Sequence, residues 1–510
     1  MRLLSFLKSN SARADAPRPT AKVIRGPWRV LRRAFEGART DRTTADWLST
    51  GRDINEELRT QLEKLRNRSR ELEQNGDHAR RFLAQVQIHV VGSAGFNLQV
   101  KGTLRNGKLD KRNNKIIEKA FWTWAKRGCC DVTGRYALAD IERLAIRTCA
   151  RDGEHLIRLH DLQPTARNPF GFALEILDPA RLDTNLNDDP RDGNRIRMGI
   201  EYDRAGAPVA YYLLRRADGS RHVNTYDRVP AENIIHDFMS DRPEQLRGIP
   251  WMASAMVRMH QLGEYEDSAL VAAREGANKM GFFSTPGGTM AALSDDTDAN
   301  GELISESSAG HFSNLPPGYQ FTPYNPDYPH QNFESFMRGH LRSIAMGLGV
   351  SYHGLTGDLS QVNFSSSRTG TLEERESWMV MQDWFAGGTL ERIYTRWFSA
   401  AMINSQIKIN VKLEEALQRY SEHLWQGRRW PWIDPKKDID AAIAAITAGL
   451  KSPQMVAAET GVDVEDVLDA IADFQAMAKS KGVNLPAYSS STGTQTTENP
   501  EPQELDDVAA

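Results

Sequence analysis

The chain has 510 residues, a hydrophobic fraction of 40% and a nearly balanced charge, with 64 Lys and Arg against 67 Asp and Glu. This length corresponds to roughly 2–4 domains, and the hydrophobic fraction is sufficient for buried cores. The near-neutral balance argues against a dedicated high-affinity nucleic-acid-binding protein, which is normally basic overall.

The cysteines and the apolar runs limit the cellular compartments in which the protein is expected. Cys129, Cys130 and Cys149 show no C-x-x-C spacing, and adjacent cysteines rarely bridge each other, so neither a disulfide framework nor a zinc site is indicated. The apolar run within residues 1–8 is too short for a signal peptide, and no window approaches 18 uninterrupted apolar residues. We therefore expect a protein of a reducing compartment that is not secreted and does not span a membrane.

The two ends of the chain differ in charge. Residues 1–50 are basic, and we interpret them as a flexible arm, either a disordered terminus or a segment that contacts nucleic acid or a neighbouring subunit. Residues 482–510 are acidic and rich in Ser, Thr, Glu and Pro, a composition typical of disorder.

Between these ends, helices come first. Apolar residues at helical spacing predict four helices, over residues 54–74, 77–91, 115–127 and 140–150. Residues 96–100 alternate like a strand. Gly92 and Gly95 follow a helix rather than a strand, so they do not form a dinucleotide-binding fingerprint.

A series of short alternating segments then predicts an antiparallel α+β domain, because Gly, Asp, Asn and Pro turns separate them. The predicted strands cover residues 155–160, 172–177, 200–202, 209–214 and 234–236. His155 and His160 are five residues apart on one strand and therefore face opposite sides, so they cannot chelate one ion together. We interpret both as ordinary sheet residues.

Two predicted helices enclose a segment of different composition. The first follows Pro250 and carries a methionine stripe, which is more often packing than ligand binding, to about residue 278. The second covers residues 331–349. The segment between them has an acidic run and then a run rich in Pro and Tyr, and we interpret it as a small projecting module.

The acidic run begins like a calcium-binding loop. Asp296, Asp298 and Asn300 occupy positions one, three and five of an EF-hand loop, and Gly301 occupies the sixth. The twelfth position should be a bidentate glutamate but is Ser307. We therefore interpret the run as an acidic surface loop, and we expect no metal and no cofactor in this protein.

A polar loop over residues 350–368 precedes a long aromatic helix predicted over residues 369–402. This loop of about 19 residues is much longer than the about 4–6 residues usual in compact domains, which indicates a function. Asp358 and Arg368 are its only full charges. Because each Lys or Arg that neutralises a phosphate adds affinity, such a surface can touch phosphates without holding them. The alternative is a solvated loop without a role.

The rest of the chain is predicted to be mainly helical. The pair Gly387–Gly388 is a natural place for a kink in the long helix. Residues 411–424 can be helical, and Trp430-Pro431-Trp432 predicts a stiff turn. A short helical pair is predicted over residues 438–450 and 463–481.

Enzyme motifs are missing from the sequence. It contains no Gly-x-x-x-x-Gly-Lys-Ser/Thr, no His-Glu-x-x-His and no Gly-x-Ser-x-Gly. The neighbouring carboxylates Glu373 and Glu374 diverge on a helix and cannot share a substrate. We expect no catalysis. The competing hypothesis is a nuclease or hydrolase with a site assembled from scattered residues, which would show metal- or nucleotide-dependent turnover.

Several short motifs follow one another in a characteristic order. They are His78-Ala-Arg80, Val90-Val91-Gly92, Arg151-Asp-Gly-Glu154, Val229-Pro-Ala-Glu-Asn-Ile-Ile-His236, Arg247-Gly-Ile-Pro-Trp251, Leu315-Pro-Pro-Gly318, Tyr324-Asn-Pro326, Asn332-Phe333, Leu348-Gly-Val-Ser351, Asn363-Phe-Ser-Ser-Ser-Arg368 and Trp430-Pro-Trp-Ile-Asp-Pro435. No single motif is specific, but their order over roughly residues 50–480 resembles the lambda-like family of tailed-phage portal proteins.

This resemblance implies an α+β portal fold with a mixed α/β wing, a two-helix stem, a small clip, a tunnel loop, a long kinked helix and a helical crown. On this chain the wing would be residues 51–250, the stem helices 251–278 and 331–349, and the clip 279–330. The tunnel loop would be 350–368, the kinked helix with its return to the wing 369–434, and the crown 435–481.

The resemblance also implies a function. Family members form a homo-oligomeric ring, typically a dodecamer, at one capsid vertex of the virion, after assembly in the host cytoplasm. Double-stranded DNA is packaged and ejected through the ring without sequence specificity. The partners would be the terminase large subunit, a head-completion or adaptor protein, and capsid and scaffold proteins. The alternative is another phage head component, such as a minor capsid or head-completion protein.

Candidate residues follow from the same resemblance. The residues expected to face DNA in the tunnel loop are His353, Gln361, Asn363, Ser365, Ser366, Ser367 and Arg368. The candidates for lining the channel from the second stem helix are Arg338 and Arg342. The candidates for partner docking in the clip are Asp295, Asp296, Asp298, Glu302, Tyr319 and Tyr324.

Overall fold

The computed structural model describes residues 42, 46, 51–190, 193–216, 222–278, 281–284, 320–323, 332–360, 364–462 and 464–483. The chain divides into two compact units, Met1–Arg52 and Asp53–Ala510, and every helix and strand given below belongs to the second. The basic arm and the acidic tail expected from the sequence fall almost entirely outside the described residues.

Four helices begin the second unit: α1 (Ile54–Asn75), α2 (Asp77–Val86), α3 (Lys111–Trp124) and α4 (Leu138–Asp152). Each lies close to a helix predicted from apolar spacing. The start of α1 is capped by Asp53, whose Oδ1 accepts a hydrogen bond from the Asn55 N–H at 2.9 Å. The predicted helix over residues 77–91 continues past α2 only as a π-helical turn, η2 (Gln87–Val91).

Two antiparallel sheets follow, as the sequence predicted. One has the order β3-β2-β8, from β2 (His155–Asp161), β3 (Phe172–Leu177) and β8 (Ile234–Asp237). The other has the order β4-β5-β6-β7, from β4 (Arg195–Arg197), β5 (Ile200–Tyr202), β6 (Pro208–Arg216) and β7 (His222–Pro230). The 3₁₀ turns η3 (Pro179–Arg181) and η4 (Ala231–Asn233) lie beside them. The sequence patterns did not predict β4 or β7. The pairing of β7 with β6 contains a register shift at Leu214/Arg215.

A third sheet joins distant parts of the chain. β1 (Asn97–Val100) pairs antiparallel with β11 (His423–Gln426), and Asn97 lies opposite Gln426. The prediction of a helix over residues 411–424 is therefore only half right, since α10 (Leu413–Arg419) ends early and the chain turns into β11. The edge of β1 supplies the backbone hydrogen bonds that a longer helix would have made internally.

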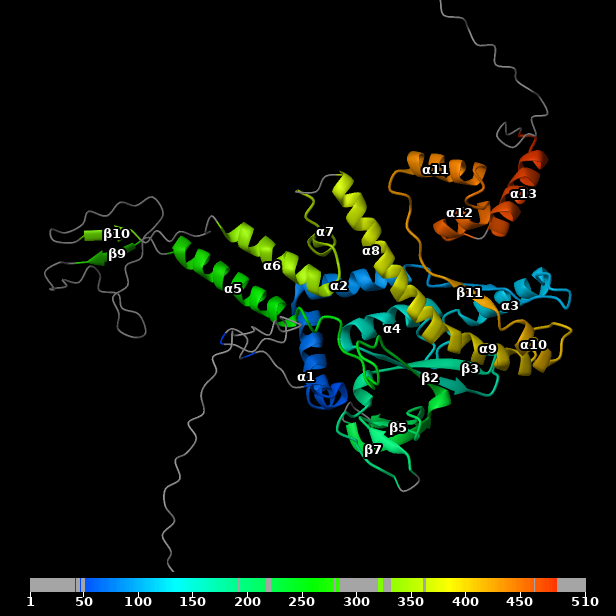
Figure 1. The fold of residues 1–510 in the computed structure, drawn as a ribbon, viewed down its shortest axis with the longest axis horizontal. Helices are drawn as coiled ribbons and strands as arrows, with labels where there is room; N and C mark the ends of the chain where they lie inside the picture. Colours follow the sequence, from blue (N-terminus) through cyan, green and yellow to red (C-terminus); the bar gives the residue numbers. More distant parts are fainter. Residues whose placement is uncertain are drawn as a thin grey trace, which may run out of the picture. The chain divides into compact units, whose positions relative to one another are not determined.

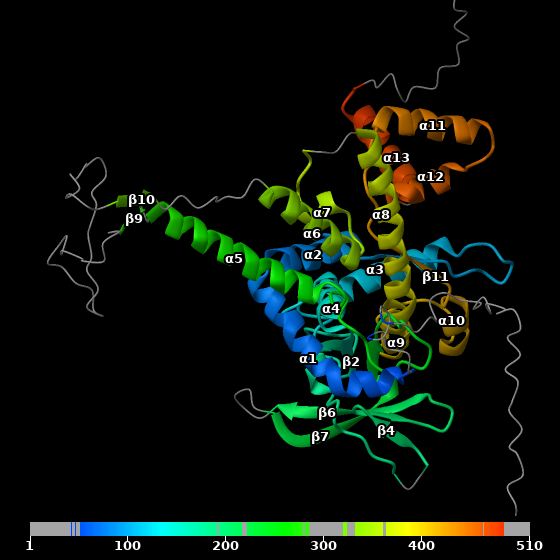
Figure 2. The ribbon, with the colours of Figure 1, turned by 60° about the vertical axis from the view of Figure 1, so that its left-hand side comes forward.

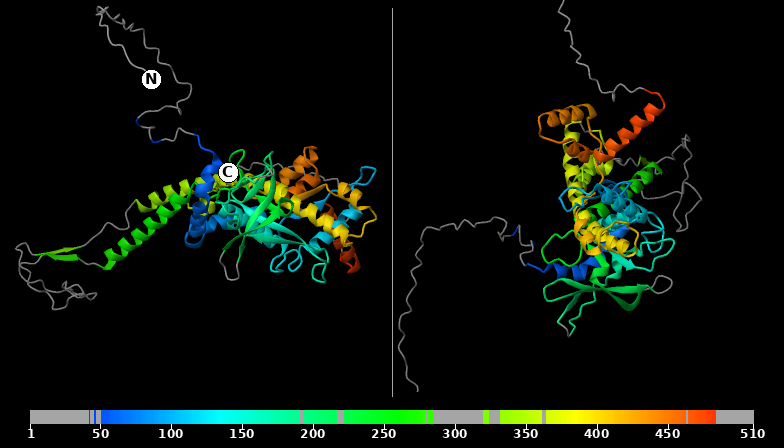
Figure 3. Two further views of the ribbon diagram at one scale, coloured as in Figure 1. Left: turned by 90° about the horizontal axis from the view of Figure 1, so that it is seen from below. Right: turned by 90° about the vertical axis from the view of Figure 1, so that its right-hand side faces the viewer.

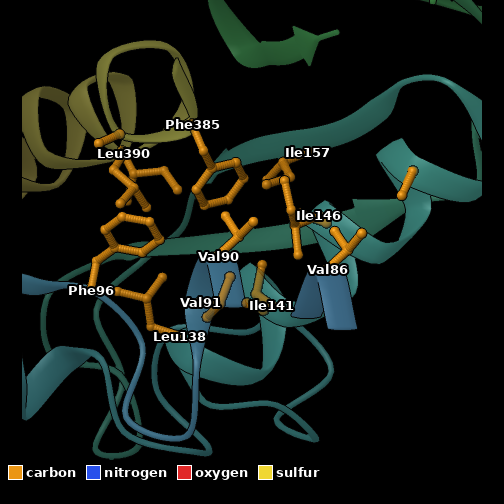
Figure 4. Packing of buried hydrophobic residues seen from close by; sticks show 14 of the residues in the cluster. Val86, Val90, Val91, Phe96, Leu138, Ile141, Ile146, Ile157, Phe385 and Leu390 are labelled. Atoms are coloured by element: carbon orange, nitrogen blue, oxygen red, sulfur yellow. The ribbon is translucent and has the colours of Figure 1, made fainter. Parts of the chain in front are cut away.

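The largest hydrophobic core gathers side chains from α2, η2, α4 and β2 around a long helix that includes α8 (Phe364–Phe385) and η5 (Ala386–Leu390) (Figure 4). Val90, Phe385 and Leu390 are fully buried there. The adjoining part of this core is aromatic, because the ring of Phe121 lies perpendicular to that of Trp397 with centroids 4.9 Å apart. The second half of the long helix is thereby packed against α3.

Two antiparallel helices, α5 (Met256–Asn278) and α6 (Phe333–Leu348), lie side by side (Figures 1 and 3). The predicted start at residue 251 was too early, since turns occupy residues 251–255. There the Trp251 N–H is held by the Ala150 carbonyl at 3.0 Å. Between the two helices the structure describes only β9 (Gly281–Ser284) and β10 (Gln320–Pro323), which pair antiparallel.

The long helix consists of α8 (Phe364–Phe385), a π-helical turn η5 (Ala386–Leu390) and α9 (Glu391–Ile403), which follow one another in Figure 2. The kink was predicted at Gly387–Gly388, and the structure has the π-helical turn at these residues. The predicted start at residue 369 was too late, because the serines after Asn363 belong to the first turn of α8.

Three helices close the described chain: α11 (Pro435–Thr447), α12 (Pro453–Thr460) and α13 (Val464–Ser480). The predicted pair is present, and α12 is an addition that begins with Ser452 as its N-cap, where Ser452 Oγ accepts a hydrogen bond from the Met455 N–H at 3.2 Å.

Candidate functional site

The predicted tunnel loop, residues 350–368, is more ordered than its composition indicated. After Gly349 ends α6 with φ of 69°, Ser351 caps a short helix, α7 (Tyr352–Thr356), by accepting a hydrogen bond from the Gly354 N–H at 3.2 Å. Gly357 ends α7 with φ of 76°, a left-handed conformation that favours glycine. The absence of periodicity between residues 350 and 368 was therefore a wrong indication of an irregular loop: two glycine stops isolate a helix too short to show a pattern.

Helix α7 is held against α2. The Gly354 carbonyl accepts hydrogen bonds from Gln85 Nε2 at 2.7 Å and from Arg81 Nε at 3.3 Å. Leu355 is buried in the main core. These contacts fix where residues 351–357 lie relative to the first helices of the unit.

The carboxylate in this segment is satisfied by its own neighbours. Asp358 accepts hydrogen bonds from the Ser360 N–H at 2.9 Å and from the Tyr352 hydroxyl at 2.9 Å. Hydrogen bonding by Ser360, and then by Tyr352, lowers the pKa of Asp358 to about 2. The ionised carboxylate is therefore stabilised by hydrogen-bond donors of its own segment.

The predicted DNA-facing residues differ in what the structure says of them. His353 lies on α7, and its Nε2 is 3.3 Å from Ser351 Oγ. Gln361 and Asn363 lie outside the described residues, and Ser365, Ser366 and Ser367 are described only as part of the α8 backbone. Arg368 points to the C-terminal helices, where its Nη2 is 2.9 Å from Asp438 Oδ1. Whether any of these side chains faces DNA stays a prediction.

The two predicted channel-lining arginines both lie on α6. Arg338 pairs with Glu334 one turn earlier. The guanidinium of Arg342 lies over the Tyr352 ring, 5.6 Å from its centroid. Both cations are therefore close to the α7 segment, and their role in a channel also stays a prediction.

The candidates for partner docking, Asp295, Asp296, Asp298, Glu302, Tyr319 and Tyr324, lie outside the described residues. The same holds for the loop that begins like an EF-hand. Within the described part of the chain, no group of three or more His, Cys, Asp or Glu side chains could hold a metal ion. In the same part of the chain, no helix is long and apolar enough to cross a membrane.

The irregular turn η5 is fitted to β8. Thr389 Oγ1 donates a hydrogen bond to Asp237 Oδ2 at 3.0 Å and lies 3.0 Å from Nε2 of the buried His155. A Cβ on Gly388 would come within 2.2 Å of the same Asp237 oxygen, so only glycine lets the turn approach so closely. Burial raises the pKa of Asp237 to about 6 and lowers that of His155 to about 3.

His155 and His160 take separate roles, as expected. His155 is buried beside η5, whereas His160 pairs with Glu175 at 2.8 Å on the neighbouring strand. Neither contributes to a common ion site.

The junction that carries the first residues of α5 is a buried ion cluster that the sequence did not reveal. The carboxylate of Glu154 has no exposed surface and accepts hydrogen bonds from Arg247 Nε at 2.9 Å and from Arg66 Nη2 at 2.9 Å. His236 Nε2 lies 3.1 Å away and the Gly248 N–H donates at 3.0 Å. Burial alone would raise the pKa of Glu154, but Arg247 and His236 hold it well below its usual range.

Two glycines let the strands of this junction cross. A Cβ on Gly153, where φ is 93°, would come within 2.5 Å of the Ile249 backbone. A Cβ on Gly248 would come within 2.0 Å of the Gly153 carbonyl oxygen. The motifs Arg151-Asp-Gly-Glu154 and Arg247-Gly-Ile-Pro250, noted only for their order, therefore meet in space. The Arg and Gly residues that both motifs share were the available signal.

Comparison with known proteins decides the family. The family model described as phage portal protein, lambda family, matches residues 40–382, more than half of the chain. The chain belongs to the lambda family of phage portal proteins. The resemblance drawn from the motif order is thereby confirmed, and the alternative of a different phage head component is set aside.

Curated relatives agree with this assignment. The probable portal protein of Halomonas phage phiHAP-1 is 35% identical over 512 residues, which cover 98% of this chain and 96% of that protein. Portal protein B of Escherichia phage lambda is 22% identical over 82% of this chain and 85% of its own length. Among solved structures, the neck of an empty gene transfer agent particle matches with a TM-score of 0.44 and 14% identity, over 79% of this chain and 93% of that one.

Proposed function

We propose that this portal protein closes into a ring, a dodecamer, at one vertex of a phage capsid, and that double-stranded DNA is packaged and ejected through it without sequence recognition. Copies would assemble in the host cytoplasm and remain in the virion. The protein would work without catalysis and without a cofactor.

The observation that carries this proposal is that the charged side chains described within residues 350–368 are hydrogen-bonded or ion-paired within the chain. In the described residues of 350–368, Asp358 is hydrogen-bonded within its own segment and Arg368 is paired with Asp438. A ring of such segments would present phosphates with hydroxyl, imidazole and backbone groups but with no unpaired guanidinium. DNA bound through few cations keeps low affinity, so it can move.

The division of labour along the chain follows from the same proposal. Residues 51–250 with 369–434 would form the wing, α5 and α6 the stem, and 350–368 the tunnel segment. Residues 435–481 would form the crown. The segment 279–330, with β9 paired to β10, would be the clip that docks the terminase large subunit and later a head-completion or adaptor protein. Capsid and scaffold proteins would contact the ring from outside.

Deletion of residues 358–363, which connect the end of α7 to α8, tests the tunnel assignment. Electron microscopy of the purified variant should show rings with a central hole, as for the unaltered protein, while particles made with it should fail to package or retain DNA. Deletion of residues 217–221 between β6 and β7 is the matched control, and it should leave packaging intact. Normal packaging by the first variant would overturn the tunnel assignment. An unaltered protein that stays monomeric at every salt and protein concentration would overturn the ring.

A further inference from the structure

Helix α5 contacts both α6 and α1 and leaves a further face exposed. The face toward α6 contains the buried side chains Met259, Leu262 and Ala269. On the α6 side, Met337, Ile344 and Leu348 are buried. Tyr265 stacks on Phe333 with ring centroids 5.9 Å apart, which closes this seam at its far end. The two helices therefore pack against each other along the hairpin, and their outward faces are not needed for this packing.

The outward face of α5 combines apolar ends with an acidic centre. Val257 is 60% exposed and Val271 is 55% exposed, although both are apolar and lie on the line opposite the seam. Between them, at helical spacing, the face carries the exposed carboxylates Glu264 and Asp267. His260 pairs with Glu264 at 3.3 Å, so the centre of this face is at most partly neutralised from within.

The outward face of α6 has the opposite character. Met346 is 84% exposed, the largest exposed fraction among the large hydrophobic side chains of the described residues. Arg342 is exposed on the same face, and Arg338 lies at its edge. A Cβ built on Gly339 meets no atom within 4 Å, so a second helix has room to approach here.

The two faces also match in height along the hairpin. Ser254 Oγ donates to the Gly347 carbonyl at 2.8 Å, and Tyr265 lies beside Phe333. Because the helices are antiparallel and rise about 1.5 Å per residue, Val257 is level with the turn that contains Met346. Glu264 of α5 is likewise within about one turn of Arg338, whereas Arg342 is level with Val257.

We propose that the outward face of α5 in one copy packs on the outward face of α6 in the next copy. This inference rests on the proposed ring. Val257 would meet Met346, and Glu264 would meet Arg338. Because the two faces differ, the contact is heterologous, and a heterologous contact closes into a ring rather than a two-fold dimer. Arg338 and Arg342 would then lie between neighbouring stems instead of lining the channel.

Charge reversal tests the contact. The variants E264K/D267K and R338E/R342E each place like charges across it, so each should raise the protein concentration at which half of the chains are in rings by tenfold or more, measured by light scattering after size exclusion. The fourfold variant restores opposite charges and should recover most of this loss. Far-ultraviolet circular dichroism of the monomer fraction checks that each variant is folded.

Each failure has a separate meaning. Rings that form equally well in both double variants, or a fourfold variant that assembles no better than the doubles, would overturn the contact while leaving the ring itself intact. Normal rings of R338E/R342E that lose DNA would assign α6 to the channel instead. An unaltered protein that forms no ring would overturn the proposed function as well.

Cross-linking offers a test that does not depend on charge. Cys129, Cys130 and Cys149 are all buried, so they should react little when a pair of surface cysteines is introduced and oxidised. Ser268 of α5 and Ser335 of α6 are exposed and level with each other. Mild oxidation of S268C/S335C rings should give a ladder of covalent oligomers on a non-reducing gel, whereas S268C alone should give at most dimers. Rings of the pair variant without a ladder would contradict the contact.

Discussion

The junction around Glu154 and the hairpin of α5 and α6 treat charge in opposite ways. At the junction, a carboxylate without exposed surface is surrounded by Arg66, Arg247 and His236 from the same chain. On the hairpin, Glu264 and Asp267 are exposed on α5, whereas on α6 Arg338 pairs with Glu334 and Arg342 lies over the Tyr352 ring. The first arrangement is complete within one subunit, whereas the second is the surface that we propose meets a neighbouring copy.

The junction therefore positions the hairpin within the subunit, and the hairpin surface is the part that we propose for contacts between subunits. The junction leads directly from Arg247 through Pro250 to the first turn of α5, so it sets where the hairpin begins. Buried charges are costly unless every partner is present, and such a cluster therefore tolerates only one arrangement. Exposed charges cost little in the free subunit and gain value when a neighbour excludes water.

The largest effect is expected at the centre of the junction. Glu154→Gln removes the charge that compensates Arg66 and Arg247 and should lower the free energy of unfolding by about 3–5 kcal/mol. Chemical denaturation of the monomer measures this loss. Glu56→Gln, which breaks an exposed pair with Arg59, is the control and should cost less than about 1 kcal/mol. Equal losses in the two variants would show that the junction is not the critical contact.

Two glycines extend the comparison to the backbone. Gly153→Ala should cost at least about 1–3 kcal/mol, because φ is 93° and the new Cβ would meet the Ile249 backbone at 2.5 Å. Gly339→Ala on the open face of α6 should instead raise the monomer's stability by about 1 kcal/mol, since alanine favours the helix and nothing lies within 4 Å. Thermal unfolding of both variants at one pH decides this, and a stabilising Gly153→Ala would refute the crossing geometry.

A buried carboxyl on α4 should make stability depend on pH. Burial raises the pKa of Glu142 to about 8 from 4.5, although its Oε2 accepts a hydrogen bond from the Phe96 N–H at 3.0 Å. A carboxyl whose pKa rises on folding stabilises the folded state fully below about pH 4.5, and this contribution is lost as the pH rises to about 8. The loss is on the order of 4 kcal/mol.

Glu142→Gln keeps the acceptor but cannot ionise, so its free energy of unfolding should fall less than that of the unaltered protein between pH 5 and pH 8. The exposed Glu373→Gln is the control and should follow the unaltered protein. Parallel curves for all three proteins would mean that Glu142 is not buried in solution.

The smallest effect is expected where α8 meets the C-terminal helices. Arg368→Ala removes a pair with Asp438 in which the arginine side chain is 35% exposed, so the loss should not exceed about 1 kcal/mol. Differential scanning calorimetry with Arg396→Ala, another partly exposed pair, as the reference measures it. A loss of stability as large as that of Glu154→Gln would show that the Arg368–Asp438 pair behaves like a buried ion pair rather than an exposed one.

Local patterns predicted most helices, several antiparallel strands and a kink at Gly387–Gly388, where the structure has the π-helical turn. They failed where structure depends on partners far along the chain. β11 forms only because β1 pairs with it, and α7 is too short to have a period of its own. The Glu154 cluster draws on residues from four separate segments, so no window of sequence contains it. Of the candidate site, the sequence showed that Asp358 and Arg368 are charged. The partners of Asp358 are its own sequence neighbours, whereas the partner of Arg368 is Asp438, far along the chain.

The pairing of β1 with β11 also determines when this sheet can form during translation. Asn97 leaves the ribosome 329 residues before its partner Gln426. At about 5–20 residues per second, β1 waits on the order of 15–65 s with an unpaired edge. The third sheet therefore closes only when most of the subunit has been made. A chain released early would keep that edge open, and a truncated product would be exposed to proteolysis before it could join other copies.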